Sequence, residues 1–151
     1  MPIPDFTEFG LLPTGFHNTD THEIEARYCG NPNRAVIWEQ FLECYRLELQ
    51  PLGWSNIVWV DGGFTSDKPH TKDIDVVMDV SQLDDSALFQ AMLWHGTHHD
   101  RLEQSYHTDF WLYHPRLPSD LRSFFAYVKE HERLARRAPL GTTKGLLRLE
   151  L

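Results

Sequence analysis

Cysteine is scarce in this chain, with only Cys29 and Cys44 among 151 residues. Two cysteines do not build a disulfide framework, so a reducing, cytoplasmic setting is expected. No apolar run approaches the roughly 20 residues of a membrane span, and the first residues do not form a basic leader with an apolar stretch, so neither a membrane protein nor a signal peptide is expected. Repeats and low-complexity stretches are also missing, which favours one domain over residues 1–151.

Positive charge is scarce as well, since the net charge is −8. An acidic chain binds nucleic acid poorly without sequence preference, because cations hold phosphate backbones. The charge is uneven: residues 116–151 hold eight Lys and Arg against four Asp and Glu, which gives +4 there and −12 elsewhere. A basic segment facing an acidic metal site would suit a triphosphate. The alternative is a solvated helix with i,i+4 ion pairs, such as Glu132 with Arg136.

The apolar pattern predicts helices and strands in alternation. Residues 1–18, with several Pro and Gly, are expected to form an irregular arm that packs on the domain through its apolar side chains. Helices are expected over residues 21–28, 34–50, 84–95 and 119–136, and strands over residues 56–61, 73–80, 106–114 and 144–149. This order indicates an α/β (α+β) fold: a short mixed sheet of four to five strands with helices mainly on one face.

Two of the expected strands carry the most informative residues. The apolar run 57–60 ends at Gly62 and Gly63, and about ten residues later a β-branched run begins with Asp73 and Asp75. Side chains alternate along a strand, so the two aspartates share a face. Their repulsion is relieved by a hard divalent cation, which takes oxygen ligands, while a glycine turn lets backbone N–H groups approach phosphate. The alternative is a strand-start cap at Asp73 and a surface residue at Asp75.

These motifs resemble the signature of the polymerase-β-type nucleotidyltransferases. The matching residues are Val60-Asp61-Gly62-Gly63 and Asp73-Ile74-Asp75-Val76. The third carboxylate of that superfamily lies on a later strand, and Asp109, before Phe110-Trp111-Leu112, fits it. Further stretches are similar to a group of small uncharacterised bacterial proteins of the same superfamily. They are Asp5-Phe6, Gly10-Leu11-Leu12-Pro13, Gly15-Phe16-His17, Thr65-Ser66-Asp67-Lys68-Pro69 and Lys144-Gly145-Leu146-Leu147-Arg148.

The resemblance implies a two-metal enzyme that moves NMP from an NTP to a hydroxyl acceptor. Asp73, Asp75 and Asp109 would be the catalytic ligands of two Mg²⁺ or Mn²⁺ ions, with Asp109 able to take the hydroxyl proton. Gly62 and Gly63 would bind the β,γ-phosphates through amides at a helix N-terminus. The acceptor stays open between a small molecule, a protein and an RNA. Small proteins of this superfamily often belong to toxin–antitoxin or phage-defence modules, which implies a partner protein.

The loop between the two motif strands holds further candidates for nucleotide binding. They are Thr65, Ser66, Lys68 and Lys72, with an ordinary polar loop as the alternative. Candidates for the rim of the site are His17, His107, Lys144 and Arg148. His107 is included because strand alternation would put it on the face of Asp109, together with Trp111 or Tyr113, either of which could stack a base.

Three histidines follow one another closely after the expected helix over residues 84–95. His95 and His99 have the i,i+4 spacing that brings two imidazoles together in zinc sites. Gly96 and Thr97 weaken a helix there and no cysteine is near, so His95, His98 and His99 are expected on the surface.

Two other functions compete with the transferase. The first is a non-catalytic module on the same fold that binds a nucleotide or a partner, as an antitoxin or a sensor would. Three converging carboxylates argue against it, because binding alone does not require them. The second is a metal-dependent phosphodiesterase that uses the same ions. Labelled NTP with Mg²⁺ or Mn²⁺ separates transfer, which releases pyrophosphate, from binding, which does not.

Overall fold

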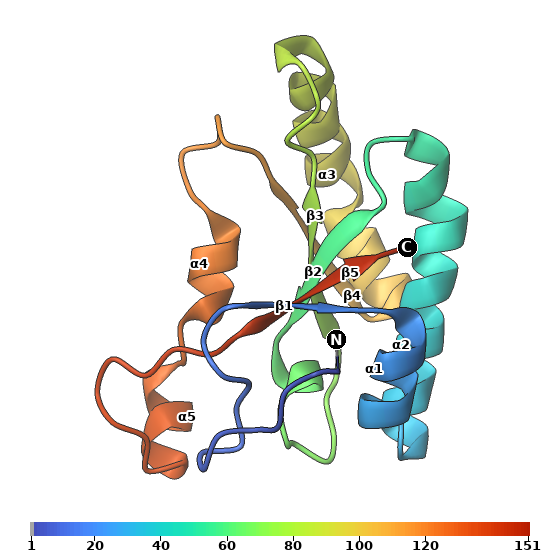
Figure 1. Cartoon of the computed structure of the whole chain (residues 1–151). Helices are drawn as coiled ribbons and strands as arrows, with labels where there is room; N and C mark the ends of the chain where they lie inside the picture. The colour runs from blue at the N-terminus through green and yellow to red at the C-terminus, as the bar shows by residue number, and fades with distance from the viewer. Residues whose placement is uncertain (1) are drawn as a thin grey trace.

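The computed structural model describes residues 2–151 and contains one five-stranded mixed sheet (Figure 1). Its order is β1 (Phe16–Thr19), β5 (Leu146–Glu150), β2 (Ile57–Asp61), β3 (Ile74–Asp79) and β4 (Thr108–Tyr113). The pairs β1–β5 and β3–β4 are parallel, and β5–β2 and β2–β3 are antiparallel. The expected mixed sheet and α+β class are therefore confirmed.

Within residues 2–151, five α-helices accompany the sheet: α1 (Thr21–Tyr28), α2 (Pro32–Cys44), α3 (Asp85–Tyr106), α4 (Leu121–Ala126) and α5 (Glu130–Ala135). Four of them begin at a polar residue whose side chain accepts a hydrogen bond from a first-turn N–H: Asp20, Asn31, Asp84 and Asp120. Such caps satisfy amides that have no partner within the helix. No helix within residues 2–151 has the length and apolar character needed to cross a membrane.

The two faces of the sheet are unequal. Val60, Val76 and Phe110 point toward the large core that α1, α2 and α3 cover. On the opposite face, Trp59 and Val77 belong to a smaller cluster beneath α4. Figure 1 shows α4 and α5 on the side of the sheet away from α1 and α2. Helices thus cover mainly one face. On the other, here called the open face, Asp75 and Asp109 near the starts of β3 and β4 remain partly exposed.

Several elements differ from the expectations. Helix α3 runs through Gly96 for 22 residues, since a single exposed glycine costs a helix only about 1 kcal/mol and Leu102 is buried beyond it. The helix expected over residues 119–136 is broken into α4 and α5, because Tyr127 leaves helical geometry and forms an isolated bridge with Thr143. The end of the expected irregular arm is strand β1.

The helix expected over residues 34–50 is irregular in its last part. Helix α2 is followed by a π-helical turn, Tyr45–Leu49, and a 3₁₀ turn, Gln50–Leu52. Pro51 lies in that last turn and Gly53 follows it in the left-handed region, with φ 68°. These two residues end the helical segment as expected.

Candidate active site

Strand register places three aspartates in a row across the sheet. Asp61 of β2 lies opposite Asp75 of β3, and Asp75 lies opposite Asp109 of β4. Paired residues on neighbouring strands point to the same side, and here that side is the open face rather than the core of α1–α3. In the sequence, Asp61 is only one residue of the Val60-Asp61-Gly62-Gly63 motif and is not a predicted ligand. The register shows that it extends the row to three strands.

Asp75 occupies the centre of this row. Its burial, followed by the charge of Asp73, contact with Asp109 and the charge of Asp61, raises the pKa of Asp75 to about 8. The ionised form is therefore disfavoured by desolvation and by its acidic neighbours together. A bound divalent cation would reverse both effects.

Asp61 is the most deeply buried acid of the row, only 1% exposed. Burial raises its pKa to about 7, and the charge of Lys144, whose Nζ lies 3.8 Å from Asp61 Oδ2, opposes that shift. Within residues 2–151 neither Asp61 oxygen has a hydrogen-bond partner. Buried polar atoms without partners are rare and call for an explanation, such as an ion.

Asp109 is held by a histidine that sequence reasoning assigned to the surface. His99 Nε2 lies 2.7 Å from Asp109 Oδ1, and His99 Nδ1 lies 3.0 Å from Asp100 Oδ1. Burial alone would lower the pKa of His99, but the contacts with these two acids outweigh it and raise the pKa. His95, one turn earlier, contacts the Phe110 carbonyl at 2.6 Å. The continuous α3 brings both histidines to β4, and the sequence signal for this was their i,i+4 spacing.

Asp73 precedes β3 and contacts a carboxyl group that sequence reasoning missed. Glu103 of α3 hydrogen-bonds to Asp73, and burial followed by this contact raises the pKa of Glu103 to about 7. Two carboxyl groups can share a hydrogen bond only when one of them is protonated. The acidic cluster thus has five members: Asp61, Asp73, Asp75, Glu103 and Asp109.

The donor set fits a hard cation, although its present side-chain geometry is not that of a chelate. As they lie within residues 2–151, no three His, Cys, Asp or Glu side chains form a ready metal-binding group. Carboxylate oxygens are the ligands that Mg²⁺ and Mn²⁺ prefer, and the cluster carries more acid than its surroundings neutralise. Ion binding would compete with the contacts that Asp109 makes with His99 and that Asp73 makes with Glu103.

The glycine pair follows β2 directly and adjoins this cluster. Gly62 has φ 84° and ψ −162°, and a Cβ at this position would overlap the Asp75 carboxylate. Only glycine adopts this backbone conformation without strain. Gly63 begins a single 3₁₀ turn, Gly63–Thr65, so the expected helix N-terminus beside the glycines is absent.

Gly62→Ala is expected to lower the free energy of unfolding by about 3 kcal/mol or more, because strain and the overlap with Asp75 add. Urea unfolding measures this loss. Gly96→Ala is the control: its Cβ would meet open space, so it should stabilise the exposed helix slightly. Equal effects of the two substitutions would contradict the close approach of Gly62 to Asp75.

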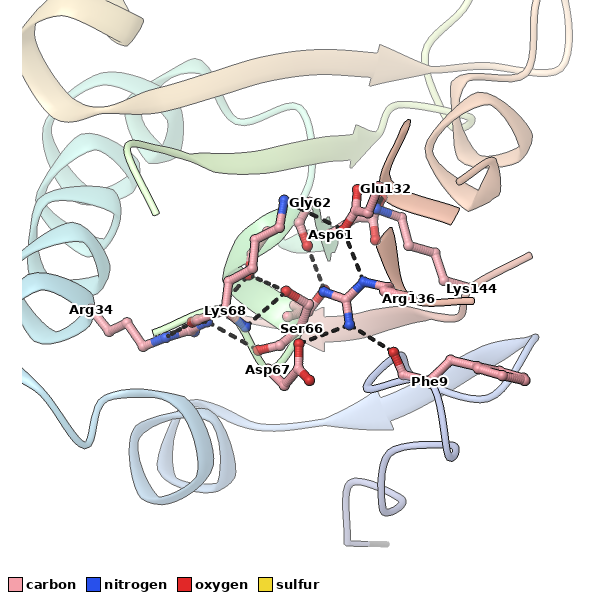
Figure 2. Close-up of polar contacts among 12 residues, drawn as sticks. Phe9, Arg34, Asp61, Gly62, Ser66, Asp67, Lys68, Glu132, Arg136 and Lys144 are labelled. Atoms are coloured by element: carbon pink, nitrogen blue, oxygen red, sulfur yellow. Dashed lines mark hydrogen bonds and ion pairs between the residues drawn. The ribbon is translucent and has the colours of Figure 1, made fainter. Parts of the chain in front are cut away.

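Arg34 of α2 fixes the loop after the glycine pair. It is 6% exposed, and its guanidinium donates to the carbonyls of Gly63 at 3.2 Å, Ser66 at 3.0 Å and Lys68 at 3.0 Å, and also to that of Phe64. Figure 2 shows Arg34 reaching from α2 to this loop. Sequence reasoning missed it. The signal was an arginine in register with the buried stripe of α2, one turn before Ile37 and Trp38.

The hydroxyl groups of this loop serve the loop itself. Thr65 Oγ1 donates to the Gly62 carbonyl at 3.3 Å, and Ser66 Oγ donates to the Gly63 carbonyl at 2.8 Å. Both side chains are buried. They shape the turn, whereas sequence reasoning placed them at a nucleotide.

Arg34→Met should lower the free energy of unfolding by about 3 kcal/mol, since several carbonyls lose their donor while packing volume is nearly kept. Equilibrium urea denaturation measures it, with Arg46→Met on the exposed side of the π-helical turn as the matched control. A change below about 0.5 kcal/mol for Arg34→Met would show that the guanidinium does not hold the loop.

Lys68, from the loop after the glycine pair, and Arg136, at the end of α5, both contact Glu132 of α5 (Figure 2). Glu132 Oε1 lies 3.4 Å from Lys68 Nζ and 3.3 Å from Arg136 Nε. Burial alone would raise the pKa of Glu132, but the charges of Lys68 and Lys144 outweigh it and lower the pKa. Lys144 therefore lies beside Asp61 of the cluster, and Lys68 lies beside the glycine turn. Their roles at a nucleotide and at the rim of the site stay predictions.

The remaining candidates lie apart from the carboxylates or on the outside. His107 ends α3 with φ 52° and contacts Gln40 of α2, and so does not share the face of Asp109. His17 pairs in register with Leu147, a residue of the α1–α3 core, and contacts the Pro13 carbonyl at 2.6 Å. Lys72 is exposed, and Arg148 lies opposite Trp59 on the open face.

The two aromatic residues expected near Asp109 are on its face. Trp111 packs against His99, with ring centroids 4.6 Å apart, and its indole nitrogen is buried without a partner among the described residues. The Arg122 Cζ lies 3.6 Å from the centre of the Tyr113 ring, and the ring centres of Tyr113 and Trp59 are 5.6 Å apart. Trp111 is thus the nearer neighbour of the acidic cluster.

Comparison with known proteins gives the chain a family but no described activity. No curated protein and no solved structure matches it. A protein-family profile matches residues 4–150, well over half of the sequence. The chain belongs to the Family of unknown function (DUF6932).

Proposed function

We propose that this protein is a Mg²⁺- or Mn²⁺-dependent nucleotidyltransferase that transfers NMP from an NTP to a hydroxyl group. The observation that carries the proposal is the row Asp61, Asp75 and Asp109, in register on adjacent strands of one face. The pKa of the central Asp75 is raised first by burial and then by its acidic neighbours, which supports a site that a divalent cation would stabilise. Such a cluster beside a glycine turn matches the chemistry that the motif resemblance implies.

The role of each aspartate follows from its place in the acidic cluster. Asp73, Asp75 and Asp109 supply the oxygen ligands, and bound ions would neutralise the triphosphate and polarise the acceptor hydroxyl. Asp109, backed by His99, takes the proton of that hydroxyl. The hydroxyl oxygen forms a bond to the α-phosphorus, and the bond from that phosphorus to the pyrophosphate oxygen breaks. Pyrophosphate leaves with its electron pair.

Lys68 and Lys144 supply positive charge for the phosphates. Each is now near a carboxylate: Lys68 Nζ lies 3.4 Å from Glu132 Oε1, and Lys144 Nζ lies 3.8 Å from Asp61 Oδ2. A triphosphate would compete with Glu132 for Lys68, because phosphate oxygens are strong acceptors for ammonium groups. Glu132 therefore holds the lysine ready in the absence of nucleotide.

Glu132→Gln is expected to tighten the binding of a non-hydrolysable NTP by about fivefold, because it removes a negative charge that competes for Lys68 and repels the triphosphate. Calorimetric titration with Mg²⁺ measures this. Glu130→Gln is the control, since Glu130 is an exposed acid on the same helix. Weaker binding by Glu132→Gln would show that Glu132 supports the nucleotide instead.

A second candidate function is a non-catalytic nucleotide- or partner-binding module. The contact of Asp109 with His99 favours it, because in this state the carboxylate is occupied by a side chain. We also propose, for either function, that the protein acts in the cytoplasm and with a partner protein in a toxin–antitoxin or phage-defence module. For the transferase, the hydroxyl acceptor is a small molecule, a protein or an RNA. The free thiols of Cys29 and Cys44 agree with a reducing setting.

Pyrophosphate release separates these functions. The protein is incubated with each labelled NTP and Mg²⁺ or Mn²⁺, together with pools of small molecules, RNA and protein as acceptors. Release by the wild type and its loss in Asp75→Asn supports transfer. Tight NTP binding without pyrophosphate, under every acceptor tried, supports the binding module and contradicts the transferase.

A further inference from the structure

A second concave site lies outside the acidic cluster, between the N-terminal arm and helices α1 and α2. The cavity has a volume of about 370 Å³, and its lining includes Phe6, Arg27, Tyr28, Asn31 and Arg34. Residues 66–69 of the loop close one side. None of the five acids of the cluster lines it. Its size suits a small organic ligand.

Two guanidinium groups at this cavity have no acidic partner within residues 2–151. Arg27 donates to the carbonyls of Ile3 at 3.3 Å and Pro4 at 3.1 Å, which leaves its Nε without a protein acceptor there. Arg34 is buried and donates to loop carbonyls. Neutral carbonyls orient a guanidinium but leave its charge in place.

Tyr28 provides a second, independent observation. Tyr28 is one of the lining residues and is 3% exposed, and its hydroxyl, closed to solvent in this ligand-free state, has no hydrogen-bond partner among the described residues. Burial raises the pKa of Tyr28 to about 12, opposed by the charges of Arg27 and Arg34, so the hydroxyl stays protonated and can donate. An unpaired buried hydroxyl is costly, and a ligand oxygen would satisfy it.

The cavity also has an aromatic wall. The rings of Phe6 and Tyr28 lie 6.2 Å apart, and the Arg27 guanidinium lies 4.7 Å from the Phe6 ring centre. Helix α2 begins beside the cavity at Asn31, and the N-terminus of a 13-residue helix adds a partial positive charge. Cations, a hydroxyl donor and flat apolar surface therefore meet in one place.

We infer that this cavity binds a small molecule that carries both a phosphate group and a planar ring. Arg27 and Arg34 neutralise the phosphate, the Tyr28 hydroxyl donates to one of its oxygens, and the ring packs against Phe6.

Asp67 and Lys68 also line the cavity, so its lining carries three cations against one acid, a net charge of +2, and the Asp67 carboxylate is itself paired with Arg136. This charge favours a phosphate dianion over a single carboxylate. The inference does not depend on the transferase proposal. It does connect the two sites, because the segment around Lys68 borders both.

The test uses calorimetric titration of the full chain in EDTA, with AMP, inorganic phosphate and adenosine as probes. AMP should bind more tightly than phosphate or adenosine. Arg27→Gln should weaken AMP binding by about tenfold or more, and Tyr28→Phe by about fivefold, while Tyr28→Phe leaves the Tm unchanged or raises it. Unaltered stability in Tyr28→Phe excludes misfolding as the cause of weaker binding.

Two control variants locate the binding. Arg46→Gln removes an exposed positive charge elsewhere and should leave the AMP affinity within about twofold. Asp75→Asn should leave it unchanged, which separates this cavity from the acidic cluster. The inference is overturned if neither AMP nor phosphate binds below about 10 mM. It is also overturned if Tyr28→Phe and Arg27→Gln bind like wild type, or if Asp75→Asn removes binding.

Discussion

Asp75→Asn is expected to lower the rate of pyrophosphate release by about 10³-fold or more while making the ligand-free protein more stable at pH 8. Asp75 is the central ligand of the cluster, so its neutral amide cannot hold the ions. The same carboxylate is buried beside Asp73, Asp109 and Asp61, which disfavours its charge. Its removal relieves that repulsion. The two effects have opposite signs, which a merely structural aspartate would not produce.

Asp79→Asn is the matched control for this prediction. Asp79 lies on β3, four residues beyond Asp75 and on the same face, and its carboxylate accepts the Ser81 N–H at 3.0 Å. It should retain pyrophosphate release within a fewfold of wild type. Measurement combines steady-state release with thermal unfolding at pH 8. Full activity in Asp75→Asn, or equal loss in both variants, would show that the acidic cluster takes no part in the reaction.

Without divalent ions, the Tm should fall by about 5–10 °C as the pH rises from 5 to 8. Asp61, Asp75 and Glu103 have folded-state pKa values of about 7, 8 and 7, well above the roughly 4 of unfolded chains. Over this interval the folded state holds more protons than the unfolded state, so the free energy of unfolding decreases as pH increases. The stabilisation is complete below about pH 4 and lost through pH 7–8.

Magnesium should cancel this loss, because it binds the ionised carboxylates of the folded state. The rise in Tm on adding 10 mM Mg²⁺, measured by calorimetry, should therefore be much larger at pH 8 than at pH 5. Asp75→Asn should show a shallower pH dependence and little response to Mg²⁺. A Tm that is flat between pH 5 and 8, or an equal response to Mg²⁺ at both pH values, would contradict the account.

Local patterns were sufficient to predict strands β2 and β3 and the glycine turn of the candidate site. Alternation along β3 correctly put Asp75 on the face opposite Ile74, and the glycine pair ended β2 as expected. The α+β class with one mixed sheet followed from the order of apolar runs. These features depend on residues within a few positions of one another, which is the range that sequence periodicity describes.

Contacts between distant segments were beyond that range. His99 meets Asp109 only because α3 continues past Gly96, and Glu103 reaches Asp73 for the same reason. Arg34 lies about thirty positions from the loop that it holds, so its place in the buried stripe of α2 indicates burial but does not identify its partners. Likewise, the break between α4 and α5 depends on the bridge from Tyr127 to Thr143. In each case tertiary packing decided the outcome.

The most direct test of the central claim is a crystal soaked with Mn²⁺ and a non-hydrolysable NTP, with anomalous scattering recorded near the manganese edge. The account predicts two manganese peaks on the open face, bound by Asp75 and shared with Asp73 and Asp109, with the triphosphate beside Gly62. The peaks should be absent in Asp75→Asn. Nucleotide density without manganese at these carboxylates, or manganese that persists in Asp75→Asn, would contradict it.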